Sequence, residues 1–125
     1  MKPYYSKKVI ERFLHPQFIG KIKKPNGVGK AGNPLCGDIL TLYIKVEQGK
    51  IENISYKTLG CAAAISVSDI LCEMVKGKTL DQALKINFQD IVDKLRPLPP
   101  IKIHCTQLGV QALRAAIEDY KKRKK

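Results

Sequence analysis

Several features are scarce or missing in this chain, and each absence argues against a class of protein. Tryptophan is absent and aromatic residues make up only 6% of the sequence, so side chains on which bases could stack are few. No apolar run reaches the length that crosses a bilayer. The start, Met1-Lys2-Pro3-Tyr4, lacks the apolar segment of a secretory signal. We therefore expect a cytoplasmic protein with no membrane partner.

The cysteines lack the close spacing that is typical of common zinc and redox motifs. The chain has four of them but no Cys-x-x-Cys pair, which argues against a zinc ribbon or a thioredoxin-type motif. In a reducing cytosol, cysteines more often bind metal or perform chemistry than form disulfides. The four thiols are therefore candidates for a metal or sulfur site.

The length of 125 residues fits one domain, residues 1–125. The net charge of +12 looks like a nucleic-acid signature until it is divided along the chain. Residues 1–30, 31–120 and 121–125 carry +7, 0 and +5, so the charge belongs to the ends. Basic ends attract anionic surfaces without specifying one. We expect the tail 121–125 to be a solvated, frayed terminus, and we do not expect nucleic acid as a partner.

The pattern of apolar residues predicts an α+β fold. Alternation over 39–46, a turn at 47–50 and a return through 51–58 predict a β-hairpin. A Gly-rich loop over 19–35 carries at most one weak strand, around 20–24. Helices are expected at 6–14, 61–76, from the capping box at Thr79, at 87–95, and from 105 onward as a long apolar stripe. The expected architecture is a small antiparallel sheet of about three strands packed against several helices, with a long C-terminal helix.

Three cysteines occupy boundaries between these elements. Cys36 lies just before the hairpin, and Cys61 lies where its second strand passes into a helix. His104 and Cys105 follow a Pro-rich segment at the point where the last helix begins. Side chains at such boundaries have no packing role in a periodic face, so we interpret the three places as one site. Helix N-termini stabilise thiolate, and thiolates with one imidazole suit zinc or an iron–sulfur cluster.

Each residue also has a simpler explanation. Cys36 could be a small buried hydrophobic residue and Cys61 could pack at a helix start. Asp38 could be a turn residue before the strand or could supply a hard oxygen ligand. Cys72 serves as a contrast, because it lies eleven residues after Cys61 on nearly the same helical face, about 16 Å away along the axis. We expect Cys72 in the core.

The residues resemble one family, the IscU/NifU-type scaffold proteins for iron–sulfur cluster assembly. The resemblance covers nearly the whole chain and includes Cys36-Gly37-Asp38, Gly60-Cys61 and the segment Pro99-Pro100-Ile101-Lys102-Ile103-His104-Cys105. It implies a scaffold rather than an enzyme. Such a scaffold accepts sulfur from a cysteine desulfurase, combines it with iron and electrons from donors into a [2Fe–2S] cluster, and transfers the cluster to recipient apo-proteins.

The resemblance also implies roles for individual residues. Cys36, Cys61 and Cys105 would ligate the cluster and carry persulfide, with Asp38 or His104 as the fourth ligand and Lys102 assisting. The segment Leu98, Pro99, Pro100, Ile101 and Lys102 is similar to the recognition sequence for a DnaK-type chaperone. A cluster could lie within one chain or bridge a homodimer, and Zn²⁺ could occupy the resting site.

Two alternatives stay open from the sequence. One is a zinc-bound, SufU-like acceptor of persulfide sulfur, although His104 directly before Cys105 argues against it. The other is a basic module that binds nucleic acid through its charged ends.

Overall fold

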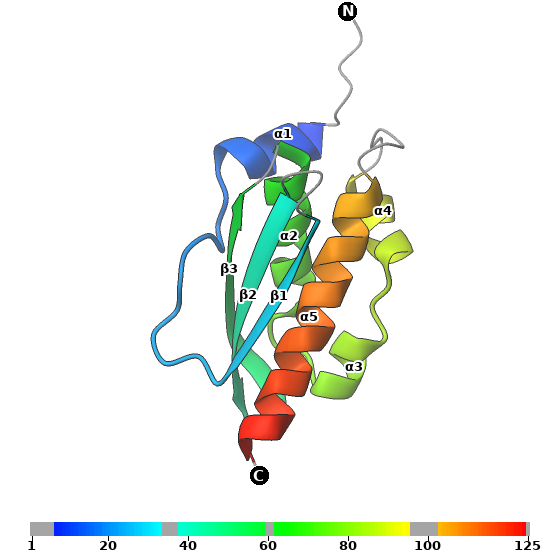
Figure 1. The fold of residues 1–125 in the computed structure, drawn as a ribbon. Coiled ribbons are helices and arrows are strands. Elements are labelled where there is room, and N and C mark those ends of the chain that lie inside the picture. Colours follow the sequence, from blue (N-terminus) through cyan, green and yellow to red (C-terminus); the bar gives the residue numbers. More distant parts are fainter. Residues whose placement is uncertain (1–6, 34–37, 60–61, 96–102, 125) are drawn as a thin grey trace, which may run out of the picture.

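The computed structural model describes residues 7–33, 38–59, 62–95 and 103–124. Within these ranges the chain forms helices on one side of an antiparallel sheet (Figure 1). This arrangement agrees with the α+β fold predicted from the sequence. The elements in chain order are α1 (Lys7–Leu14), β1 (Gly27–Asn33), β2 (Asp38–Glu47), β3 (Lys50–Leu59), α2 (Ala62–Val75), α3 (Leu80–Leu84), α4 (Phe88–Leu95) and α5 (Ile103–Lys124).

The predicted hairpin is confirmed as β2 and β3. The strands pair antiparallel in the sheet order β1-β2-β3, and alternate residues of β2 are buried as the pattern predicted: Leu40, Leu42, Ile44 and Val46. Gln48 and Gly49 form the two-residue turn, and both have positive φ, at 54° and 75°. That conformation matches the twist of the flanking strands, which favours glycine in the second position.

The first strand lies where the sequence did not predict it. The weak strand expected around 20–24 is not a strand, and β1 instead spans Gly27–Asn33. Its core-facing positions include Gly27 and Gly29, where an added Cβ would collide with the backbone of Ala116 and Ala112 on α5. Helix α5 therefore packs directly against the backbone of β1. The prediction failed because the side-chain periodicity that marks a strand is missing where glycine makes the contact.

The segment before β1 protects the outer edge of β3. Tyr56 donates its amide N–H to Phe18 O at 3.0 Å and accepts from Gly20 N at 2.8 Å. Beyond it, Ile22 N donates to Ser55 Oγ at 3.2 Å, on the face of the sheet opposite the helices. An exposed strand edge is a template for aggregation, so this pairing also removes a liability of the fold.

Helix boundaries follow the predicted caps. Thr79 and Gln82 form the reciprocal capping box that opens α3. Asn87 and Asp90 make the same pair of bonds at the start of α4, with distances of 3.0 and 3.2 Å. Helix α5 continues to Lys124 and so includes residues 121–124 of the basic tail, whose fraying in solution stays a prediction.

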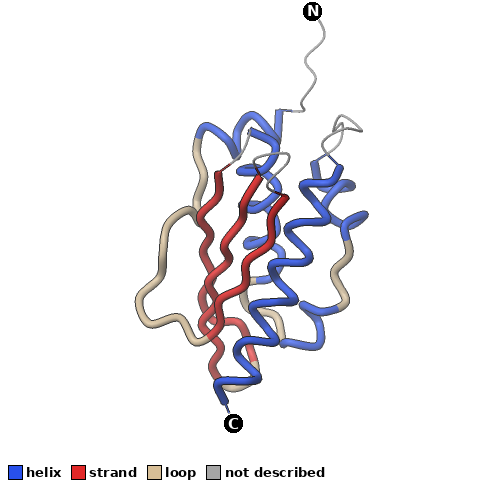
Figure 2. Tube along the Cα trace, viewed as in Figure 1, coloured by secondary structure: helices blue, strands red, loops and turns tan. Residues whose placement is uncertain are grey.

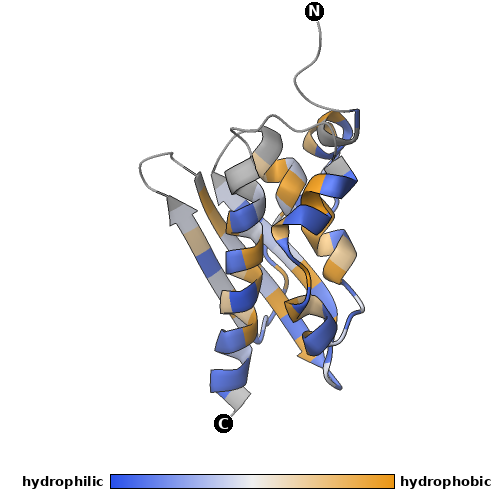
Figure 3. Ribbon diagram, turned by 90° about the vertical axis from the view of Figure 1, so that its right-hand side faces the viewer, coloured by the Kyte–Doolittle hydropathy of each residue, from blue (hydrophilic) through white to orange (hydrophobic). Residues whose placement is uncertain are grey.

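The core lies between the sheet and a helical layer in which α5 covers β1 and β2 and α2 covers β3 (Figure 2). Figure 3 shows hydrophobic residues gathered where α5, the neighbouring helices and the sheet meet, with hydrophilic residues along the outer side of α5. Cys72 is fully buried in this core, as predicted. In the described part of the chain, no helix combines the length and the hydropathy needed to span a membrane.

Candidate functional site

The described residues that border the candidate site come together at one end of the fold. In the sheet, Asn33 at the end of β1 pairs with Asp38 at the start of β2. The next residue of β2, Ile39, pairs with Leu59 at the end of β3. The hairpin therefore places Asp38 beside the residue from which the chain continues to Gly60 and Cys61.

The start of α5 reaches the same end. Ala116 lies beside Gly27 and Ala112 beside Gly29, so helix and strand run antiparallel. Four helical residues advance about 6 Å and two strand residues about 6.6 Å, so the two elements stay in step. If the pairing of Gly27 with Ala116 and of Gly29 with Ala112 is extended toward the end of β1, Asn33 reaches the level of the first turn of α5. That turn contains the backbone of His104 and Cys105.

Helix α2 starts at this end as well. A Cβ added at Gly109 would lie 3.2 Å from Leu71 and 3.4 Å from Val67, so α2 and α5 contact each other within the first ten residues of each helix. Figures 1 and 2 show the starts of α2 and α5 and the ends of β1 and β3 at one end of the molecule. Cys61 immediately precedes α2 in the sequence, and His104 and Cys105 belong to the first turn of α5.

For the predicted ligands, the structure gives only the backbone positions of Asp38, His104 and Cys105. Asp38 begins β2, and His104 and Cys105 lie in the first turn of α5. Cys36, Cys61, Lys102 and the segment 98–101 lie outside the described residues. Among the residues that the structure describes, no three His, Cys, Asp or Glu side chains form a group that could hold a metal ion. The ligand set therefore stays a prediction.

The chemistry available at this end follows from the two helix starts. The first N–H groups of a helix have no intrahelical acceptor and carry a partial positive charge. Neither α2 nor α5 has an acidic residue in its first turn. Each helix start therefore favours a negative ligand or a thiolate nearby, and a thiolate is the form of cysteine that binds iron or zinc and carries persulfide.

Sequence reasoning missed a buried carboxylate that ties the N-terminal region to α2. Asp69 is fully buried. Its Oδ1 accepts the amide N–H groups of Gln17 at 2.8 Å and Phe18 at 2.9 Å, and the Tyr56 hydroxyl at 3.3 Å. Its Oδ2 accepts Arg12 Nη1 at 2.9 Å. The available signal was an aspartate directly before the apolar residues Ile70, Leu71 and Cys72 of the predicted helix, because a carboxylate buried there needs a partner.

This network lies outside the predicted ligands, but its negative charge adds to the effect of burial on the pKa values of two neighbouring groups. Burial, followed by the negative charge of Asp69, raises the pKa of the Tyr56 phenol and keeps it neutral. Burial and the same carboxylate raise the pKa of the Cys72 thiol well above 9.0. Cys72 is therefore a thiol at neutral pH, and its full burial agrees with the core position that the sequence predicted.

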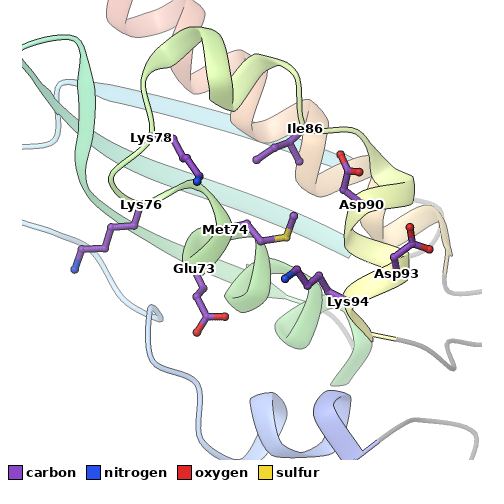
Figure 4. Close-up of a pocket in the computed structure, with 8 residues that line it drawn as sticks. All are labelled: Glu73, Met74, Lys76, Lys78, Ile86, Asp90, Asp93 and Lys94. Carbon is purple, nitrogen blue, oxygen red and sulfur yellow. The ribbon is translucent and has the colours of Figure 1, made fainter.

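A hollow of about 780 Å³ lies away from the candidate site, between the end of α2 and α4 (Figure 4). The described residues lining it carry three lysines and three acids around Met74 and Ile86, and include no cysteine or histidine. Figure 4 shows the Lys78 and Lys94 side chains reaching toward Met74, while Lys76 points away. The balanced charge favours no one ligand class, so this hollow is not the candidate site.

Comparisons with known proteins agree with the fold. The family model described as NifU-like N terminal domain matches residues 4–125. A curated protein of Archaeoglobus fulgidus, "Iron-sulfur cluster assembly scaffold protein IscU 1", is 50% identical over 116 residues, which are 93% of this chain and 76% of that protein. Its counterpart from Azotobacter vinelandii is 44% identical over 124 residues, 96% of each chain.

Solved structures show the same fold at lower identity. A putative iron–sulfur cluster assembly scaffold protein for the SUF system, from Fervidobacterium islandicum, superposes with a TM-score of 0.75 at 23% identity, covering 91% of this chain and 96% of that one. A NifU-like N-terminal protein from Brucella abortus gives 0.74 at 21% identity, covering 94% of each chain.

Proposed function

This chain belongs to the family of the NifU-like N-terminal domain, and from that premise we propose that it is a scaffold for the assembly of iron–sulfur clusters. The observation that carries the proposal is that relatives 44–50% identical over more than nine-tenths of the chain are named for this function. The names of these relatives do not favour the zinc-bound acceptor or the nucleic-acid module.

The cargo of the family is an iron–sulfur cluster, and we propose a [2Fe–2S] cluster here. Cys36, Cys61 and Cys105 would supply three thiolates, with Asp38 or His104 as the fourth ligand. The convergence of Asp38, the start of α2 and the first turn of α5 at one end supports this set. Three thiolates with one exchangeable ligand suit a scaffold, because the cluster must be released as well as held.

The proposed cycle begins with sulfur delivered as a persulfide on one of these cysteines by a cysteine desulfurase. Each sulfane sulfur needs two electrons to leave the cysteine as sulfide: one would come from a ferrous ion, which becomes ferric, and one from an external donor. Two ferric ions and two sulfides would then make up the [2Fe–2S] cluster. Lys102 would assist near the site, and the segment 98–102 would bind a DnaK-type chaperone that promotes release to recipient apo-proteins. Consecutive prolines restrict the backbone of an unbound chain, so such binding would need little further ordering.

We propose a carrier without turnover of its own. The relatives from Archaeoglobus fulgidus and Azotobacter vinelandii are named scaffold proteins. A relative from Drosophila melanogaster is named an assembly enzyme. We also propose a cytoplasmic location, although relatives from yeasts are named mitochondrial. A cluster-bridged homodimer is one arrangement that would complete the ligand set.

The test is anaerobic reconstitution with a cysteine desulfurase, cysteine, ferrous iron and a reductant. Iron, zinc and acid-labile sulfide are measured beside the visible spectrum. We expect equal iron and sulfide with thiolate-to-iron charge-transfer bands. Zinc that persists, with sulfur present only as persulfide and no colour, would contradict the scaffold and favour a sulfur relay.

The chain offers its own control. Cys36→Ser, Cys61→Ser and Cys105→Ser should each impair assembly, while substitution of the buried Cys72 should not. Cys72→Ala is a better control than Cys72→Ser, because serine would bury a hydroxyl group in the apolar core. Normal assembly by all three site variants would refute the ligand set.

A further inference from the structure

The face of the sheet opposite the helices contains a hollow of about 540 Å³. Two features distinguish it from the mixed-charge hollow near α4. The described residues that line it include two lysines but no acid, and it has apolar side chains that are open to solvent. Its lining includes Lys30, Lys57, Thr41, Thr58, Ile19 and Ile39.

The two lysines occupy one row across all three strands. Lys30 pairs with Thr41, and Thr41 pairs with Lys57. Opposite residues have Cβ atoms about 5 Å apart, so the two lysines leave the sheet about 10 Å apart on either side of one threonine. Both side chains are exposed. The row therefore holds two positive charges that no lining acid compensates.

A third ammonium group borders the neighbouring row. Lys21 Nζ lies 5.9 Å from the centre of the Tyr43 ring, and Tyr43 stands beside Ser55 in that row. The segment that covers the edge of β3 thus brings a lysine toward the same face. The positive field above the hollow comes from three separate stretches of the chain.

Exposed apolar side chains adjoin the row of lysines. Ile19 is 53% exposed and Ile39 is 37% exposed, and both belong to the few large hydrophobic residues that the described part of the chain leaves open. Exposed apolar side chains bordered by charged ones are typical of a protein–protein interface, and we call Lys30 and Lys57 the rim of this one. A bare polyanion would gain nothing from the isoleucines. A second copy of this chain docked through the same face would place these lysines against their own counterparts, and like charges repel.

The position of the hollow connects it with the candidate site. Ile39 directly follows Asp38 and pairs with Leu59, so the hollow reaches the end of the sheet that borders the candidate ligands. We propose that this hollow is the docking surface for an acidic partner protein, the acceptor of the cluster. The proposal rests on the scaffold function, because it names the charge and the docking face of the recipient.

The test compares two double variants of equal charge. Lys30→Glu with Lys57→Glu reverses the proposed rim, and Lys85→Glu with Lys94→Glu makes the same charge change on exposed residues of the helical layer. The probe is a plant-type apo-ferredoxin with an acidic surface. Its affinity for the metal-free chain is measured by isothermal titration calorimetry at two salt concentrations, and transfer is measured from the reconstituted chain.

We expect the rim variant to bind the apo-ferredoxin about tenfold or more weakly at low salt, with a smaller salt dependence. Cluster transfer should slow to a similar extent, while assembly on the variant keeps the wild-type rate. The control variant should stay within about twofold of wild type. Lys30→Gln with Lys57→Gln should fall between wild type and the reversal.

Three outcomes would overturn the proposal. Equal weakening in both double variants would mean that only net charge matters. Unchanged binding in the rim variant would place the docking surface elsewhere. Full displacement of the ferredoxin by millimolar pyrophosphate at constant ionic strength would assign the hollow to small anions. Binding is measured without a cluster, so a failure of assembly refutes the scaffold function separately from the docking surface.

Discussion

Removal of the buried carboxylate of Asp69 should cost more stability than removal of Glu73, the other charged residue of α2. Asp69→Ala deletes an acceptor that serves Arg12, two backbone amides and the Tyr56 hydroxyl. Arg12 keeps a second partner, because its Nη2 donates to Glu73 Oε1 at 2.7 Å. The main loss is therefore at the amides of Gln17 and Phe18, which are left without an acceptor.

The expected magnitude follows from burial. Breaking a buried ion pair by removing one partner costs about 3–5 kcal/mol, and an unsatisfied buried group costs about 1–3 kcal/mol. Because 18% of the Arg12 side chain is exposed and remains paired, we expect a total of about 3–4 kcal/mol. A domain of this size has roughly 5–15 kcal/mol in all, so the variant should be visibly less stable but folded.

The assay is urea unfolding of the metal-free protein followed by circular dichroism, with the slope m compared between variants. Glu73→Ala is the matched control, since its side chain is 49% exposed in the same network, and it should cost no more than about 1 kcal/mol. Asp69→Asn keeps an acceptor for the amides and should cost less than Asp69→Ala. Equal, small losses for Asp69→Ala and Glu73→Ala would show that the buried network contributes little.

Two further predictions concern the core. Gly29→Ala should destabilise the protein by about 3 kcal/mol, because the new Cβ would overlap the backbone of Ala112 and Ala116. Lys30→Ala on the opposite face should stay within about 0.5 kcal/mol, and equal unfolding midpoints in urea for the two variants would contradict the close packing. Stability should fall as pH rises above 9, because folded Cys72 and Tyr56 keep protons that the unfolded chain releases near 9.0 and 10.0. The decline is measured as the free energy of unfolding in urea titrations at pH 9–10. Cys72→Ala should lessen it by up to about 1.4 kcal/mol per pH unit. An unchanged decline would show that Cys72 does not titrate on unfolding.

The parts of the fold that the sequence predicted are those that depend on local pattern. Alternation in β2 marked its buried face, and the capping residues Thr79 and Asn87 marked two helix starts. The place of Cys72 in the core followed from helical spacing alone. In each case the deciding neighbours lie within a few residues along the chain.

The parts that it missed depend on distant partners. Strand β1 carries glycine where α5 approaches, so its identity as a strand depends on a helix more than 80 residues later. Three of the four partners of Asp69 lie 51, 52 and 57 residues away, and the fourth, Tyr56, lies 13 residues away. An aspartate in an apolar helix announces that a partner exists, but not which one.

One part of the candidate site depends on local pattern and the other depends on distant partners. An antiparallel hairpin returns the end of its second strand to the level of Ile39, so the approach of Asp38 to the end of β3 could be expected from the sequence. The irregularity at Lys45 and Val46, which makes Leu59 rather than Thr58 the partner of Ile39, could not. The level of His104 and Cys105 depends on the register between α5 and β1, which the glycines of β1 set. The resemblance to a family supplied that part of the site before the structure did.

Helix α5 holds the basic tail far from the candidate site at its first turn. The helix contains 22 residues, from Ile103 to Lys124, and is therefore about 33 Å long at 1.5 Å per residue. At physiological ionic strength the Debye length is about 8 Å, so the field of the basic tail decays over several such lengths before it reaches the first turn. The tail can therefore bind or release an anionic surface without changing the ionisation of a thiolate at the other end, which only the nearby amides and ligands control.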